Sequence, residues 1–179
     1  MARLRPVKKE EAPAVLQPIY EQLGKGRGGS PINIFQLMAN SPTTLQAFVQ
    51  LLSMSNKTLS PAILERISLL TAQQNGCNYC LAAHSLLAKN VANLSDAEIK
   101  QARQALADEP KTQKLLQFVK AVVSKQGKIS DEDFAALKDA GVSDKEICDL
   151  ILAIVVNIFT NYFNNCCKTD LDFPPALPL

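Results

Sequence analysis

The sequence predicts an all-α protein, a helical bundle of about eight helices in one domain. Helix-start signals recur along the chain, apolar residues follow them at helical spacing, and no segment alternates as a strand does. The 179 residues suffice for one sizeable core, and a content of 47% hydrophobic and 20% charged residues is ordinary for a globular protein. We expect a single domain over residues 1–179, with an N-terminal helical arm and Gly-rich loop at 1–30 and an extended tail at 170–179.

Helix starts are indicated by serine residues that can cap exposed backbone N–H groups. A capping serine stands before a proline, which suits the first helical position, at Ser41-Pro42 and Ser60-Pro61. A serine followed three residues later by a glutamate forms a capping box, as in "SDAE" (95–98) and "SDKE" (143–146), and "SDED" (130–133) is a weaker version.

Behind these starts, apolar residues recur at the spacing of one helix face. They are Ile63, Ile67 and Leu70; Leu115, Phe118, Val119 and Val122; and Ile147, Leu150, Ile151 and Ile154. Helix ends are indicated at Asn75-Gly76, Gly127 and Gly141, where residues that tolerate a left-handed backbone occur.

Two segments resemble features of other protein classes, and we interpret both differently. The loop "GKGRGG" (24–29) matches the dinucleotide-binding pattern, but it follows a helical segment instead of a strand and runs into Pro31, so we predict a connector. The most apolar segment, 147–163, is interrupted by Asp149 and Asn157. Because a membrane-spanning helix needs about 20 largely apolar residues, we predict a central buried helix and no membrane association.

The net charge and the first residues of the chain argue against two further classes, nucleic-acid-binding proteins and secreted proteins. The formal net charge of +2 is small and the basic residues are interspersed with acidic ones, so we expect no nucleic-acid partner. No apolar run follows the basic residues at the start, so we expect no secretory signal and a cytoplasmic location.

The stretch "CNYCLAAH" (77–84) holds two of the five cysteines and the only histidine. Cys77 is predicted at a helix start and Cys80 in its first turn, where N–H groups and the helix dipole stabilise a thiolate. Residues three and four apart share a helix face, so Cys77 contacts Cys80 and Cys80 contacts His84. This geometry suits a two-thiol reaction in which one thiolate is oxidised and the other forms a disulfide with it.

Other interpretations of these residues stay open at this point. Three of the four usual zinc ligands are present, but no second histidine or second C-x-x-C follows, and adjacent cysteines such as Cys166-Cys167 rarely both bind one ion. Cysteine also packs as a small apolar residue. A histidine base needs an orienting partner, and Glu65 on the preceding helix is the candidate, although it could be only a surface residue.

The spacing Glu65, eleven residues, Cys77-x-x-Cys80, three residues, His84 resembles the E-x11-C-x2-C-x3-H signature of alkyl hydroperoxidase D, in the carboxymuconolactone decarboxylase-like superfamily. The segments 30–48 and 160–174 also resemble parts of its peroxidase-related branch. The resemblance implies an alkyl hydroperoxidase D-like all-α fold, a homo-oligomer, and cofactor-free, metal-free reduction of hydroperoxides with electrons from a dithiol or protein donor. It also implies that Cys80 is oxidised, Cys77 resolves it, and His84 and Glu65 relay protons.

One residue departs from this pattern, and several functions remain open. Some family members carry a histidine immediately before the second cysteine, where this chain has Tyr79, so the relay is expected to be shorter. Thiol–disulfide exchange with another protein and a non-catalytic oligomeric role remain as alternatives to peroxidase activity. The sequence assigns no role to Cys148, Cys166 or Cys167.

Overall fold

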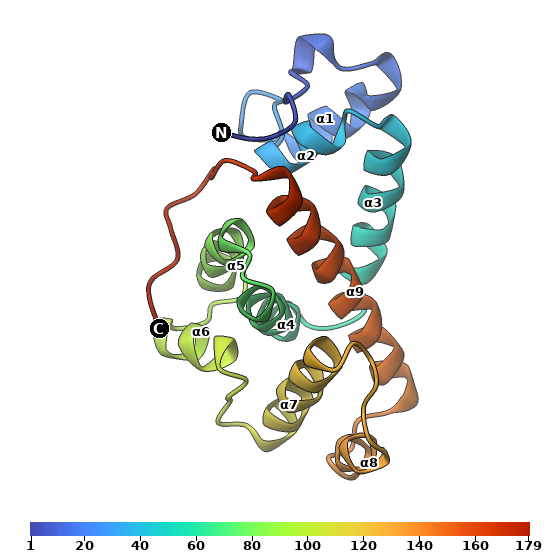
Figure 1. Ribbon diagram of the computed structural model, residues 1–179, viewed down its shortest axis with the longest axis vertical. Coiled ribbons are helices and arrows are strands. Elements are labelled where there is room, and N and C mark those ends of the chain that lie inside the picture. Colours follow the sequence, from blue (N-terminus) through green and yellow to red (C-terminus); the bar gives the residue numbers. More distant parts are fainter.

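The computed structural model describes all of residues 1–179 and contains only helices and loops, which confirms the predicted all-α class. Two short 3₁₀ turns, Lys9–Glu11 and Ala14–Leu16, precede the α-helices. The nine α-helices, shown in Figure 1, are α1 (Gln17–Leu23), α2 (Asn33–Met38), α3 (Pro42–Ser55), α4 (Pro61–Gln74), α5 (Asn78–Asn90), α6 (Asp96–Arg103), α7 (Pro110–Ser124), α8 (Asp131–Asp139) and α9 (Asp144–Cys167).

The helices begin where the serine signals predict. Ser41 and Ser60 accept hydrogen bonds from backbone N–H groups in the first turns of α3 and α4. Ser95 and Ser143 form complete capping boxes at α6 and α9, whereas Ser130 caps α8 without a reciprocal glutamate. These contacts are local, so the sequence alone determines them.

Helix α4 lies at the centre of the bundle, against α5, α6, α7 and α9 (Figure 1). One side of α4 contributes Leu69 and Ala72 to a core cluster shared with the N-terminal helices and α5. Another side contributes Ile67 and Leu70 to a second cluster with α7, α8 and α9. Because α4 is buried on two sides, residues on its remaining surface, including Glu65, are held in fixed positions relative to α5.

Helix α9 runs along the bundle but is buried on one side only, so the prediction of a central buried helix holds for one of its faces. Leu150, Ala153 and Ile154 are buried. The opposite side leaves a row of large apolar residues exposed: Ile151, Val155, Phe159 and Tyr162. By length and composition α9 could cross a membrane, but core helices of soluble proteins pass the same test, so this is weak evidence.

The two ends of the chain lie against the bundle. The backbone N–H of Arg3 donates to the carbonyl of Cys167 at 2.7 Å. The predicted tail is extended, but it is attached, since Phe173 packs against the first core cluster and Arg103 donates to the carbonyl of Leu177 at 2.6 Å. The segment 24–29 is a turn that follows α1, so the dinucleotide-binding pattern lacks its strand.

Candidate functional site

The cysteine pair lies at the junction between α4 and α5. Asn75 is the C-terminal cap of α4, and Gly76 takes a positive φ of 61° that turns the chain. Cys77 is the N-terminal cap of α5, and its sulfur accepts a hydrogen bond from the backbone N–H of Cys80 at 3.2 Å. The predicted placement at a helix start is therefore correct.

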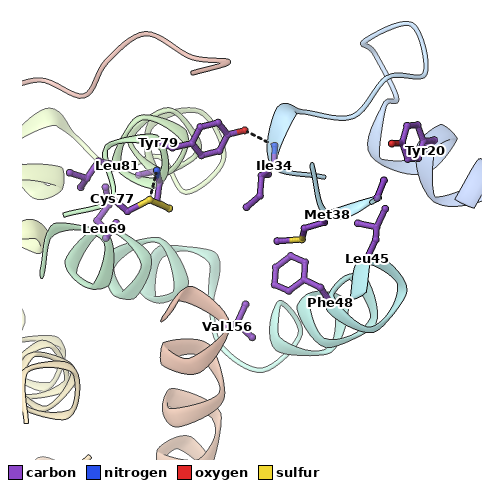
Figure 2. Close-up of a cluster of buried hydrophobic side chains, with 14 of the residues drawn as sticks. Tyr20, Ile34, Met38, Leu45, Phe48, Leu69, Cys77, Tyr79, Leu81 and Val156 are labelled. Atoms are coloured by element: carbon purple, nitrogen blue, oxygen red, sulfur yellow. Dashed lines mark hydrogen bonds between the residues drawn. A yellow bond between two sulfur atoms is a disulfide. The ribbon is translucent and has the colours of Figure 1, made fainter. Parts of the chain in front are cut away.

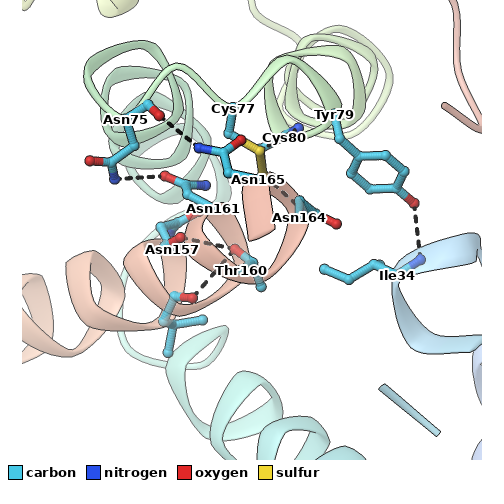
Figure 3. The surroundings of a disulfide bond; sticks show 11 residues. Ile34, Asn75, Cys77, Tyr79, Cys80, Asn157, Thr160, Asn161, Asn164 and Asn165 are labelled. Carbon is cyan, nitrogen blue, oxygen red and sulfur yellow. Dashed lines mark hydrogen bonds between the residues drawn. A yellow bond between two sulfur atoms is a disulfide. The ribbon is translucent and has the colours of Figure 1, made fainter. Parts of the chain in front are cut away.

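Cys77 and Cys80 are joined by a disulfide (Figure 3). Their Cα atoms lie 5.3 Å apart, which is within the usual range for a disulfide. Both residues are part of the first core cluster, and Cys77 is 0% exposed while Cys80 is 3% exposed. The first turn of α5 thus brings the two sulfurs together, with Cys77 fully buried and Cys80 almost fully buried.

The predicted partner of the histidine is in place. His84 Nδ1 lies 2.8 Å from Glu65 Oε2, and the two side chains are 23% and 15% exposed. An ionised carboxylate only accepts hydrogen bonds, so Nδ1 carries the proton and Nε2 is left as the basic nitrogen. Glu65 is therefore no simple surface residue, and its contact orients the imidazole ring.

A cavity of about 410 Å³ opens beside this pair. Cys80, His84 and Glu65 line it, and Cys77 does not. The rest of the wall is mostly apolar and comes from α2, α3, α4, α5 and α9, including Ile34, Phe35, Phe48, Leu52, Leu64, Leu87 and Val156. The cavity is within the size range of small-molecule sites, and its apolar wall ends at one sulfur and one imidazole.

Asparagine residues from α9 surround the disulfide, and the sequence interpretation missed them (Figure 3). Asn164 Nδ2 lies 3.3 Å from the Cys80 sulfur. Asn161 Oδ1 accepts from Asn75 Nδ2 at 3.0 Å, and Asn165 Nδ2 donates to the carbonyl of Asn75 at 2.9 Å. The signal was present in the sequence, because Asn157, Asn161 and Asn164 place amides on one face of an apolar helix.

Tyr79, between the two cysteines, is held by the C-terminal tail. Its hydroxyl donates to Asp172 Oδ2 at 2.5 Å. The same hydroxyl accepts from the backbone N–H of Ile34 at 3.5 Å, a contact shown in Figure 2. The Phe173 ring packs edge-on against the tyrosine at 5.9 Å between centroids. Burial first, and then Asp172, raises the pKa of the Tyr79 hydroxyl. Tyr79 therefore serves as a fixing point for the tail, and its hydroxyl is unavailable to a relay.

The remaining cysteines lie outside the cavity wall. Cys148 and Cys166 are exposed, and burial followed by the neighbouring Cys166 raises the pKa of Cys167. No group of three or more His, Cys, Asp or Glu side chains is gathered in a metal-binding arrangement, so Cys166 and Cys167 do not complete a site with the C-x-x-C pair.

Fold and site together define an all-α protein with a C-x-x-C disulfide and a hydrogen-bonded glutamate–histidine pair beside a cavity. Residues 42–123 match the model of the carboxymuconolactone decarboxylase family, which confirms the superfamily predicted from the sequence. This segment contains Glu65, Cys77, Cys80 and His84. A comparison with curated proteins gives no significant match.

Several solved structures share the fold. The alkylhydroperoxidase AhpD core of an uncharacterized peroxidase-related protein from Ralstonia eutropha superposes with a TM-score of 0.84 at 19% identity, covering 96% of this chain and 92% of that one. A peroxidase-related protein from Silicibacter gives 0.79 at 18% identity, covering 98% and 95%. The debrominase Bmp8 in complex with 2,3,4-tribromopyrrole gives 0.80 at 18% identity, covering 94% and 91%. At these identities the likeness is one of fold.

Proposed function

We propose that this protein is a cofactor-free thiol peroxidase that reduces organic hydroperoxides through Cys77 and Cys80. The observation that carries the proposal is the cavity, whose wall includes Cys80 and His84 but excludes Cys77. A small apolar molecule in this cavity meets one sulfur and one base. The sulfur of Cys77 is buried and does not line the cavity, so it can react only with Cys80.

The reaction begins with the reduced pair. His84 Nε2 removes the proton of the Cys80 thiol, and the thiolate attacks the terminal oxygen of the hydroperoxide. The O–O bond breaks, the alkoxide takes the proton from His84 and leaves as an alcohol, and Cys80 becomes a sulfenic acid. The Cys77 sulfur then attacks the Cys80 sulfur. The thiol proton and the sulfenic hydroxyl leave as water, and the disulfide remains.

The apolar wall favours an organic hydroperoxide over hydrogen peroxide. Leu52, Leu64, Leu87 and Val156 contact the space where the alkyl group would lie. Burial of each methylene contributes about 0.8 kcal/mol, whereas hydrogen peroxide has no carbon to bury. We expect KM to fall as the alkyl group lengthens until the cavity is filled.

The electron donor must reach Cys80 through the same cavity, because Cys77 has no exposed surface. A donor thiolate attacks the Cys80 sulfur and releases Cys77 as a thiol, and the donor's second thiol then frees Cys80. This access supports a dithiol on a small molecule or on a slender arm of a protein donor. General exchange with folded protein disulfides is disfavoured for the same reason.

The test compares substrates and donors in one assay. Consumption of cumene hydroperoxide and of hydrogen peroxide is measured with dihydrolipoamide, dithiothreitol and glutathione as reductants, and 2,3,4-tribromopyrrole is offered as the competing substrate because a protein of this fold binds it. We expect turnover of cumene hydroperoxide with dithiols and its loss in Cys80→Ser. Debromination without hydroperoxide turnover, or no turnover of either compound, would reject the proposal.

We also infer that the chain forms a homo-oligomer through the exposed row on α9. Ile151, Val155, Phe159 and Tyr162 lie three or four residues apart, so they form one continuous stripe. A second copy of the same helix covers such a stripe symmetrically around a two-fold axis.

A further inference from the structure

Asn164 is the polar side chain that α9 brings to the reacting sulfur. Its Nδ2 lies 3.3 Å from Cys80 Sγ, across 84 residues of sequence, and the side chain also lines the cavity (Figure 3). Asn164 is 4% exposed, so water does not compete for this contact. No such contact is made by α9 to the sulfur of Cys77.

The other end of the same amide has no partner. Asn164 Oδ1 is buried and accepts no hydrogen bond in the disulfide state. Buried polar atoms are nearly always hydrogen-bonded, so an unsatisfied one calls for a specific explanation. The amide that carries this atom faces a sulfur whose hydrogen-bonding character would change during the proposed reaction.

We propose that Asn164 is a further catalytic residue, which donates to the Cys80 thiolate and then accepts from the hydroxyl of the Cys80 sulfenic acid. This inference rests on the proposed peroxidase function. In the disulfide, Nδ2–H meets a neutral sulfur, a weak acceptor. After reduction and loss of the proton to His84, the same N–H meets a thiolate, and a hydrogen bond to an ionised group is about twice as strong.

The second contact follows from the atom balance of the reaction. The thiolate forms a bond to the terminal peroxide oxygen, the O–O bond breaks, and the hydrogen on that oxygen stays with it as S–O–H. The new hydroxyl is attached to the sulfur that Nδ2 already contacts, and the only unpartnered acceptor on that amide is Oδ1. When Cys77 attacks, the hydroxyl leaves as water and Oδ1 returns to its unpartnered state.

The test measures the pKa of Cys80 without peroxide. In a Cys77→Ser background, the pH dependence of iodoacetamide alkylation gives the Cys80 pKa before and after Asn164→Leu. Alkylation is read by mass spectrometry on the peptide that contains Cys80, because Cys148, Cys166 and Cys167 are free thiols as well. A hydrogen bond to a charged group contributes about 1.5–3 kcal/mol, which corresponds to a pKa rise of about one to two units. Asn164→Asp replaces the donor with a carboxylate of the same shape and should raise the pKa further.

A matched control is available one residue away. Asn165→Leu makes the same substitution on α9, where the amide contacts the carbonyl of Asn75 and no sulfur, so it should leave the Cys80 pKa unchanged. Circular dichroism melting identifies the variants that fold, and Asn164→Ala is used where Asn164→Leu does not.

The rate at which Cys80 is oxidised is measured in a second experiment. After addition of cumene hydroperoxide, dimedone labelling of the Cys80 sulfenic acid should appear about tenfold more slowly in the folded Asn164 variant. The reason is that a rise of one unit in the Cys80 pKa lowers the fraction of reactive thiolate about tenfold at a pH below that pKa. An unchanged Cys80 pKa in a folded Asn164 variant would overturn the inference. Absence of hydroperoxide turnover in the wild type would instead overturn the proposed function, and the pKa comparison would still decide whether Asn164 stabilises the thiolate.

Discussion

The hydrogen bond between Tyr79 and Asp172 joins the C-terminal tail to the residue between the two cysteines, and Tyr79→Phe removes it selectively. Tyr79 OH lies 2.5 Å from Asp172 Oδ2, and that oxygen keeps a second donor, the backbone N–H of Asn33 at 2.8 Å. A hydrogen bond to a charged group contributes about 1.5–3 kcal/mol, and a domain of this size loses roughly 2–4 °C in Tm per kcal/mol. We expect Tyr79→Phe to lower Tm by about 3–12 °C.

The same contact makes stability depend on alkaline pH. Burial first, and then Asp172, raises the pKa of Tyr79 above its ordinary value of 10.0. Because the folded state holds this proton more tightly than the unfolded chain does, its contribution to stability is complete below pH 10 and is lost as the pH rises above that value. The wild type should therefore lose stability above about pH 10 more steeply than Tyr79→Phe.

Thermal and urea unfolding, followed by circular dichroism between pH 7 and pH 11, measure both effects. Tyr162→Phe is the matched control, because it also removes a tyrosine hydroxyl, and Tyr162 on α9 makes no hydrogen bond to the tail or to any other part of the chain. Limited proteolysis should cleave the tail faster in Tyr79→Phe than in the control. Equal Tm values at pH 7 together with parallel pH profiles would refute the assignment of Tyr79 as the fixing point of the tail.

Three further predictions concern the chemistry and the assembly. His84→Gln and Glu65→Gln should each slow peroxide reduction by about 10²–10⁴-fold. The double variant should be little worse than the worse single one, because the hydrogen-bonded pair acts as a unit. Additive losses measured by stopped-flow kinetics would contradict this. Cys77→Ser should allow dimedone to trap a sulfenic acid on Cys80, whereas a label found by mass spectrometry on Cys77 in Cys80→Ser would return the attacking role to Cys77. Light scattering at micromolar concentration should give more than the mass of one chain, and Val155→Lys should shift it towards one chain; a monomeric wild type would reject the α9 interface.

The parts of the structure that the sequence predicted are those set by local contacts. The serine caps, the single glycines that follow α4, α7 and α8, and the C-x-x-C turn each depend on residues within a few positions of one another. The Glu65–His84 contact was also accessible, because the short turn at Asn75-Gly76 joins α4 to α5 and the two helices pack against each other. Glu65 was the candidate because it lies on the preceding helix, and the family spacing then supported this choice over that of a simple surface residue.

Contacts between distant segments were not accessible in this way. Tyr79 meets Asp172 across 93 residues, and Cys80 meets Asn164 across 84. Both depend on how α9 and the tail pack across α5, which hydrophobic periodicity does not determine. The amides on α9 were visible as interruptions of an apolar segment, but they were interpreted only as evidence against a membrane span.

The choice between the two cysteines illustrates why packing matters more here than the helix terminus. Cys77 caps α5 and Cys80 lies three residues later, so both sulfurs are near the same exposed N–H groups, and the helix dipole discriminates little between them. The surroundings of the two sulfurs differ more. Cys80 alone lines the cavity, receives the amide of Asn164, and lies one turn from His84, while Cys77 is enclosed. These contacts support a division of labour in which the helix start brings the sulfurs together and the elements packed around it decide which one meets the substrate.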